Sequence, residues 1–149
     1  MRLLALLVCV LLVAGCAPRL SPPYRDYEVR MAADDSLSME LREALTDSGW
    51  TVEEKSSPGI VSTQTQEIAS GLLSTTYAAL DLVPLSGDFV RVYVRAESRN
   101  VLGGRTKVYA LNGRLREAVY GPLSESLRQR GLVPLGTPRD RDEDATDED

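Results

Sequence analysis

Hydrophobic and polar residues alternate most clearly over 89–97, and this pattern predicts a β-strand with one apolar and one polar face. Successive side chains of a strand point to opposite faces, so residues two apart share a face. The apolar face would hold Val90, Val92, Val94 and Ala96, and the opposite face Phe89, Arg91, Tyr93 and Arg95.

Two other stretches carry apolar residues at helical spacing and predict amphipathic helices. The first follows the N-cap candidates Asp34, Asp35 and Ser36 and ends at Gly49, and the second runs from Asn112 to Gly131. Because proline removes a helix hydrogen bond, Pro122 predicts a kink or two short helices that meet at 121–122. The apolar stripes are Leu37, Leu41, Ala44 and Leu45, then Leu115, Ala118, Val119, Leu123 and Leu127.

Shorter alternating or β-branched segments predict the remaining strands. Turn residues at 56–59, 86–88 and 103–104 separate several of them. Leu132 and Val133 follow the second helix and are expected to fold back on its end. The expected strands are 27–31, a hairpin of 50–53 with 60–66, 76–83 and 105–111.

This order of elements predicts an α+β domain over 27–135. It would consist of an antiparallel sheet of about five strands with two helices on one face. The other face of the sheet would then remain open to solvent or to a partner.

The amino terminus has a different pattern, in which Arg2 precedes twelve uncharged residues, 3–14. A helix of that length spans only about 18 Å, whereas the hydrocarbon core of a bilayer is about 30 Å thick. The pattern is therefore typical of a cleaved secretory signal, 1–15, rather than a permanent membrane span. Three prolines, Pro18, Pro22 and Pro23, predict an extended tether over 16–26.

The residues Val13-Ala14-Gly15-Cys16 at the expected cleavage site resemble the lipobox of bacterial lipoproteins. The resemblance implies that Cys16 receives a diacylglycerol on its sulfur and an acyl group on its amine, which would fix the chain to membrane lipid. In Gram-negative lipoproteins an Asp after the cysteine looks like an inner-membrane retention signal, and Ala17 stands there instead. The resemblance thus implies the periplasm-facing leaflet of the outer membrane. The alternative is an ordinary signal with a coincidental cysteine.

The succession strand, helix, strands, helix over about 27–132 is similar to the helix-grip domains of BamC-type lipoproteins in the outer-membrane barrel-assembly machine. The resemblance implies a helix-grip-like fold. It assigns a role to no individual residue.

Charge is concentrated at the carboxyl end. The chain has 17 basic and 22 acidic residues and a formal net charge of −5, and 138–149 alone holds seven acids and two arginines. The remainder is close to neutral, which argues against nucleic-acid binding, since that function requires a basic field. The tail, 136–149, is expected to be disordered and solvated.

Several kinds of chemistry lack their usual residues. The chain has no histidine, and its two cysteines, Cys9 and Cys16, both lie near the amino terminus. A Ser-His-Asp or Cys-His arrangement cannot be built, and zinc or copper would lack its preferred ligands. Lys55 and Lys107 are the lysines of the chain and the only candidate amine bases. We expect no enzyme, no catalytic residue, no metal and no cofactor beyond the acyl groups on Cys16.

The polar face of the 89–97 strand is the candidate docking face, formed by Phe89, Arg91, Tyr93 and Arg95. Arginine binds carboxylate and phosphate groups and aromatic rings pack on apolar surface, so the expected partner is an envelope protein or an anionic envelope component. Arg105, Lys107 and Tyr109 are expected to extend this face on a neighbouring strand. The alternative is a solvent-exposed face without a docking role, on which the aliphatic parts of the arginine side chains cover the strands.

These features predict a non-enzymatic binding or scaffolding module of the cell envelope. The alternative function is a carrier or sensor of a small amphiphile held between helix and sheet. A large apolar pocket lined by Val90, Val92 and Leu41 would favour the carrier, and a packed interior would favour the docking module.

Overall fold

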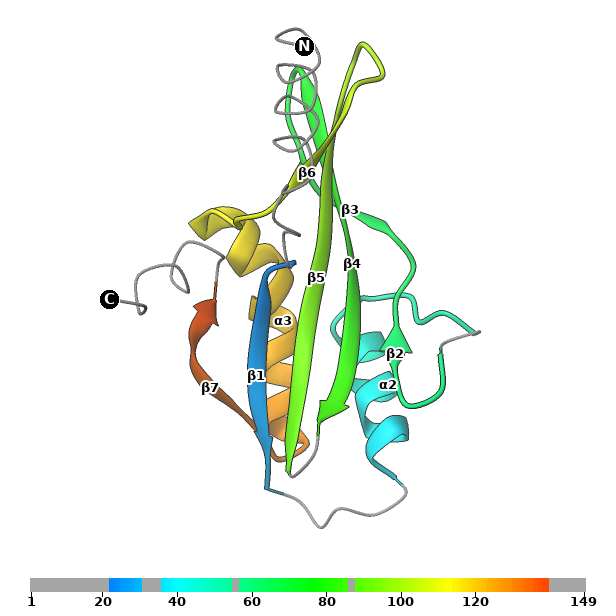
Figure 1. The fold of residues 1–149 in the computed structure, drawn as a ribbon, viewed down its shortest axis with the longest axis vertical. Coiled ribbons are helices and arrows are strands. Elements are labelled where there is room, and N and C mark those ends of the chain that lie inside the picture. Colours follow the sequence, from blue (N-terminus) through cyan, green and yellow to red (C-terminus); the bar gives the residue numbers. More distant parts are fainter. Residues whose placement is uncertain (1–21, 31–35, 55–56, 86–87, 140–149) are drawn as a thin grey trace, which may run out of the picture.

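A long antiparallel hairpin forms the centre of the fold in a computed structural model that describes residues 22–30, 36–54, 57–85 and 88–139 (Figure 1). Its strands, β4 (Ser74–Leu85) and β5 (Phe89–Asn100), pair in continuous register along their whole length. Twelve residues of extended chain span about 40 Å, so the hairpin is the long axis of the molecule.

The described part of the chain forms a seven-stranded antiparallel sheet that is five positions wide. β2 (Val61–Ser62) and β3 (Gln66–Ser70) follow one another along the outer edge of β4. β1 (Tyr24–Val29) and β6 (Arg105–Val108) share the outer edge of β5 in the same way, and β7 (Leu132–Arg139) pairs with β1. The α+β class and the antiparallel sheet are confirmed.

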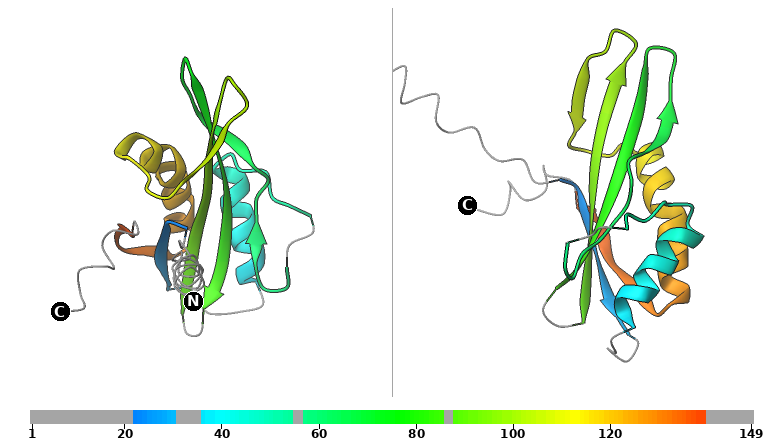
Figure 2. Two further views of the ribbon diagram at one scale, coloured as in Figure 1. Left: turned by 45° about the horizontal axis from the view of Figure 1, so that its top comes forward. Right: turned by 90° about the vertical axis from the view of Figure 1, so that its right-hand side faces the viewer.

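Both helices, α2 (Leu37–Asp47) and α3 (Gly113–Gln129), lie on one side of the sheet, as the right-hand view of Figure 2 shows. The apolar faces of helices and strands meet there in a single core. Its largest fully buried side chains are Tyr27, Leu41, Leu45, Leu80, Leu82, Leu111, Leu123, Leu127, Leu132, Val90, Val92 and Val94. The predicted apolar face of 89–97 is therefore confirmed.

The helix ends follow the sequence signals in part. The Asn112 side chain accepts a hydrogen bond from the backbone N of Leu115 at 3.0 Å, so Asn112 caps α3 as predicted. Ser36 occupies the N-cap of α2 without a side-chain hydrogen bond. Asp34 and Asp35 lie outside the described residues. Pro122 lies inside α3, which continues through it as one helix, so of the two predicted alternatives, a kink or two short helices, the second is excluded.

Two predicted strands are shorter than the sequence indicates. The hairpin of 50–53 with 60–66 is limited to one bridge between Val52 and Thr63, with backbone hydrogen bonds from Glu53 to Ser62 and from Gln64 to Thr51. The segment 61–62 also pairs with β4. β6 ends at Val108, before the predicted 111, and Leu111 is buried beneath the start of α3 rather than placed in a strand.

Leu132 and Val133 continue from the end of α3 into β7, an edge strand that pairs with β1 and that the sequence did not predict. Pro134 and Gly136 lie inside this strand, and both residue types argue against a strand in sequence. The sheet therefore extends from Tyr24 to Arg139, beyond the expected 27–135 at both ends. The rest of the expected tail, 140–149, lies outside the described residues.

Candidate docking face on the open side of the sheet

The side of the sheet opposite the helices carries the predicted docking residues, and we call it the open face. Strand register arranges its side chains in rows, because residues directly opposite each other share a face. The open face comprises Tyr24, Asp26 and Glu28 of β1, Asp81, Val83 and Leu85 of β4, Phe89, Arg91, Tyr93 and Arg95 of β5, and Val133 and Leu135 of β7.

Arg91 lies at the centre of one row and is held by Asp26 on the neighbouring strand. Its Nε and Nη2 atoms donate hydrogen bonds to the two carboxylate oxygens of Asp26, at 2.7 and 2.9 Å. Its guanidinium group lies 4.1 Å from the ring centroid of Tyr24, which contacts Tyr93 with ring centroids 5.9 Å apart. The hydrogen bonds to Asp26 raise the pKa of Arg91 above its ordinary value, so the guanidinium stays charged.

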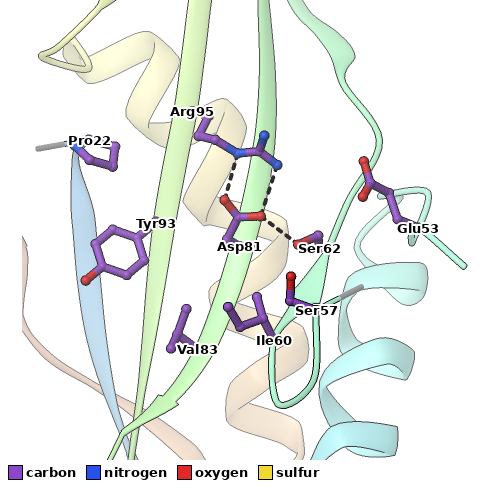
Figure 3. Close-up of a pocket in the computed structure, with 9 residues that line it drawn as sticks. All are labelled: Pro22, Glu53, Ser57, Ile60, Ser62, Asp81, Val83, Tyr93 and Arg95. Carbon is purple, nitrogen blue, oxygen red and sulfur yellow. Dashed lines mark hydrogen bonds and ion pairs between the residues drawn. The ribbon is translucent and has the colours of Figure 1, made fainter. Parts of the chain in front are cut away.

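Arg95 has an equivalent partner on the other neighbouring strand. Its Nε donates to Oδ2 of Asp81 at 2.7 Å, and its Nη2 donates to Oδ1 at 3.0 Å. The Ser62 hydroxyl donates to the same carboxylate at 2.7 Å (Figure 3). An open hollow of about 590 Å³ lies beside this pair. Ile60 and Tyr93 are among the residues that line it, so the hollow is part apolar and part polar.

These pairs change the interpretation of the face. Arg91 and Arg95 were expected to be available for an anionic ligand, and each already binds a carboxylate of this chain. An incoming phosphate or carboxylate would have to compete with Asp26 and Asp81. The open face is therefore close to charge-balanced, and it resembles the polar and aromatic composition of protein–protein contacts.

Sequence reasoning missed Asp26, Asp81 and Tyr24. Asp26 lies 65 positions from Arg91 along the chain, and nothing in the local pattern marks it as a partner. The alternation of Asp26 with Tyr27 could have placed it on the same side of the sheet as Arg91, had the pairing of the two strands been known.

The expected extension of this face on a neighbouring strand is displaced. β6 pairs with the far end of β5, which places Lys107 opposite Glu97 and Arg105 opposite Arg99. Both basic residues therefore lie toward the end of the long hairpin, away from Arg91. Tyr109 follows β6 and is not part of it.

The open face also exposes apolar surface. Phe89 is 40% and Leu135 is 41% exposed, on β5 and β7 in adjacent rows of the sheet. Large apolar side chains that face solvent beside polar groups are typical of contact surfaces.

The residues expected to line an apolar pocket between helix and sheet are buried. Val90, Val92 and Leu41 are all fully buried and pack in the core. The hollow described above lies on the opposite side of the sheet and includes none of the three.

Three further expectations concern metal sites, membrane-spanning helices and the lipobox-like residues. Within the described residues, no group of three metal-ligating side chains converges, and no helix is long and apolar enough to cross a bilayer. Val13, Ala14, Gly15, Cys16 and Lys55 lie outside the described residues.

Comparison with known proteins adds no relative, since the chain matches no protein-family model and no curated protein.

Proposed function

We propose that the chain is a lipid-anchored, periplasm-facing lipoprotein of the cell envelope. Its helix-grip-like domain acts as a non-enzymatic binding or scaffolding module that docks an envelope protein on the open face. The observation that carries the docking role is the set of paired arginines and exposed apolar residues on the sheet face opposite both described helices.

The lipid anchor is supported by the lipobox-like Val13-Ala14-Gly15-Cys16 at the end of the apolar run. Each buried methylene contributes about 0.8 kcal/mol, so a single acyl chain binds a bilayer only marginally, whereas two or three chains hold a protein there stably. The first strand, β1, begins at Tyr24, eight residues after Cys16, which suits a short tether.

Docking by a face rather than by an edge is supported by the composition of β7. This strand lies at one edge of the sheet, and Pro134 and Pro138 lie within it. Proline cannot donate a backbone hydrogen bond, so an incoming strand would find an interrupted ladder there. The charge-balanced open face in turn favours a protein partner over an anionic lipid or glycan.

The test is photocrosslinking in intact envelopes from single positions in the acylated chain. A photoreactive residue at Phe89 should yield a crosslink of defined mass, and one at Ala118, an exposed position on α3 on the other side of the sheet, should not. Leu135→Glu should abolish the Phe89 crosslink because it places a charge in the apolar part of the face, and Ala118→Glu is the matched control. Equal crosslinking from Phe89 and Ala118 would refute the docking face.

A further inference from the structure

Two hairpin ends project beyond the helices at one end of the molecule, at the top of Figure 1. The turn between β3 and β4 carries Leu72 and Leu73, which are 94% and 69% exposed. The turn between β5 and β6 carries Val101 and Leu102, which are 70% and 93% exposed. We call these four residues the apolar tip.

Hydrogen bonds connect the two turns and fix the conformation of the second one. The backbone N of Val101 donates to the carbonyl oxygen of Leu73 at 3.1 Å, which joins one turn to the other. The Asn100 side chain accepts hydrogen bonds from the backbone N of Leu102 and of Gly104, at 3.1 and 2.7 Å. The apolar tip is therefore a preformed surface made from two turns that are distant in sequence.

The charged row nearest to the apolar tip is basic, because Arg99 and Arg105 lie opposite each other there. The row behind it holds Lys107 opposite Glu97, and Glu97 forms an ion pair with Arg99. Arg105 and Lys107 make no ion pair with any described residue, although the whole chain has a net charge of −5. Apolar residues with a basic surround match a bilayer that contains anionic lipid, since the apolar groups enter the hydrocarbon and the cations remain among headgroups.

The amino end of β1, which is the end nearer to Cys16 in sequence, is directed toward the same end of the molecule. β1 is antiparallel to β5 with Tyr24 opposite Tyr93, so the amino end of β1 faces the apolar tip. Cys16 precedes Tyr24 by eight residues, and a chain of eight residues spans at most about 26–29 Å. The seven steps from Tyr93 to Asn100 cover about 23 Å of strand. The tether is thus long enough for the acylated Cys16 and the apolar tip to meet one bilayer together.

We propose that the apolar tip inserts into the same bilayer leaflet that holds the acyl chains of Cys16. This proposal rests on the lipid anchor of the proposed function. The tip is a second attachment point that holds the long axis of the hairpin upright on the membrane, so the open face is directed parallel to the membrane plane, toward neighbouring proteins.

The test uses the full acylated chain in vesicles of phosphatidylethanolamine with phosphatidylglycerol. Cys9 belongs to the expected signal and the Cys16 sulfur is expected to be acylated, so Leu102→Cys supplies a single free thiol for a spin label. The matched control is Asp88→Cys, an exposed position at the opposite end of the β4–β5 hairpin. The Leu102 label should be relaxed by oxygen, which concentrates in lipid, and shielded from a water-soluble nickel chelate. The Asp88 label should show the reverse.

The outcomes separate this proposal from the anchor. Flotation of the chain with the vesicles and the mass of its first residue report the anchor in the same sample. If the chain floats and is acylated while both labels are equally accessible to nickel, the tip proposal is wrong and the anchor stands. If the Leu102 label is shielded only in native envelopes and not in pure lipid, the tip contacts a protein instead, and the proposal is likewise overturned.

Discussion

The two faces of β5 use the same alternating pattern in opposite ways. Toward the helices, Val90, Val92 and Val94 are fully buried and are held by packing alone. Toward the open side, Arg91 and Arg95 remain partly exposed and are held by carboxylates on the two neighbouring strands. One face thus supplies the stability of the fold, and the other supplies an ordered polar surface at little cost in stability.

The largest effect is expected on the packed face. Leu80 is fully buried opposite Val94, and Leu80→Ala should lower the free energy of unfolding by about 2–5 kcal/mol, since it removes apolar contact and leaves a cavity. Leu102→Ala, at an exposed tip position, is the control and should change stability by less than about 0.5 kcal/mol. Chemical denaturation measures both, and equal losses would contradict the assignment of the core.

A smaller effect on stability is expected at Arg130, whose ion pairs connect the two helices. Arg130, at the end of α3, forms ion pairs with Glu40, Glu43 and Asp47 of α2 and is largely buried. Arg130→Met keeps most of the apolar stem and leaves three carboxylates facing one another, so it should cost about 1–2 kcal/mol of unfolding free energy. The loss should shrink in high salt, because salt screens the repulsion between the carboxylates. A loss that is independent of salt would contradict the electrostatic explanation.

The Asp26–Arg91 ion pair on the open face should contribute less to stability. Asp26 and Arg91 are each 28% exposed, so solvent screens their interaction. A double-mutant cycle with Asp26→Asn and Arg91→Met should give a coupling free energy of about 1 kcal/mol. A coupling of zero would mean that Arg91 is available to a ligand after all, and it would restore an anionic component as a partner.

An effect of similar size at neutral pH is expected at Tyr27, which is buried on the helix side of β1. Its hydroxyl lies 2.8 Å from the Ser124 hydroxyl, and loss of that hydrogen bond in Tyr27→Phe should cost about 0.5–1.5 kcal/mol.

Tyr27 should also make stability depend on alkaline pH. Burial raises the pKa of Tyr27 above its ordinary value of 10.0, since the phenolate is disfavoured in the core. The protonated side chain therefore supports the fold below pH 10, and this support is lost as pH rises from 10 toward the higher pKa of the folded state. Tyr27→Phe should remove that part of the loss. Parallel decline of both proteins above pH 10 would contradict the assignment.

The sequence pattern predicts the elements of this fold better than their partners. Alternation over 89–97 marks both faces of β5, and the cap at Asn112 marks the start of α3, because these signals depend on residues close in sequence. β7 could not be predicted in this way. Its pairing with β1 overrides the local preference of Pro134 and Gly136 against a strand.

The candidate site shows the same limit. Phe89, Arg91, Tyr93 and Arg95 share the predicted face, but their charge state depends on Asp26 and Asp81, which only strand register brings to them. The apolar tip has the same limit. Leu72 and Leu102 each lie beside a glycine-containing turn, and the sequence indicates these two turns only as separate features. Only the fold shows that the two turns touch.

The most direct test of the central claim is the mass of the mature amino terminus, purified from membranes of cells that express the full chain. The account predicts that the chain begins at Cys16, with the added mass of a diacylglycerol on sulfur and an acyl group on the amine. A free thiol at Cys16, or a chain that still carries residues 1–15, would contradict it.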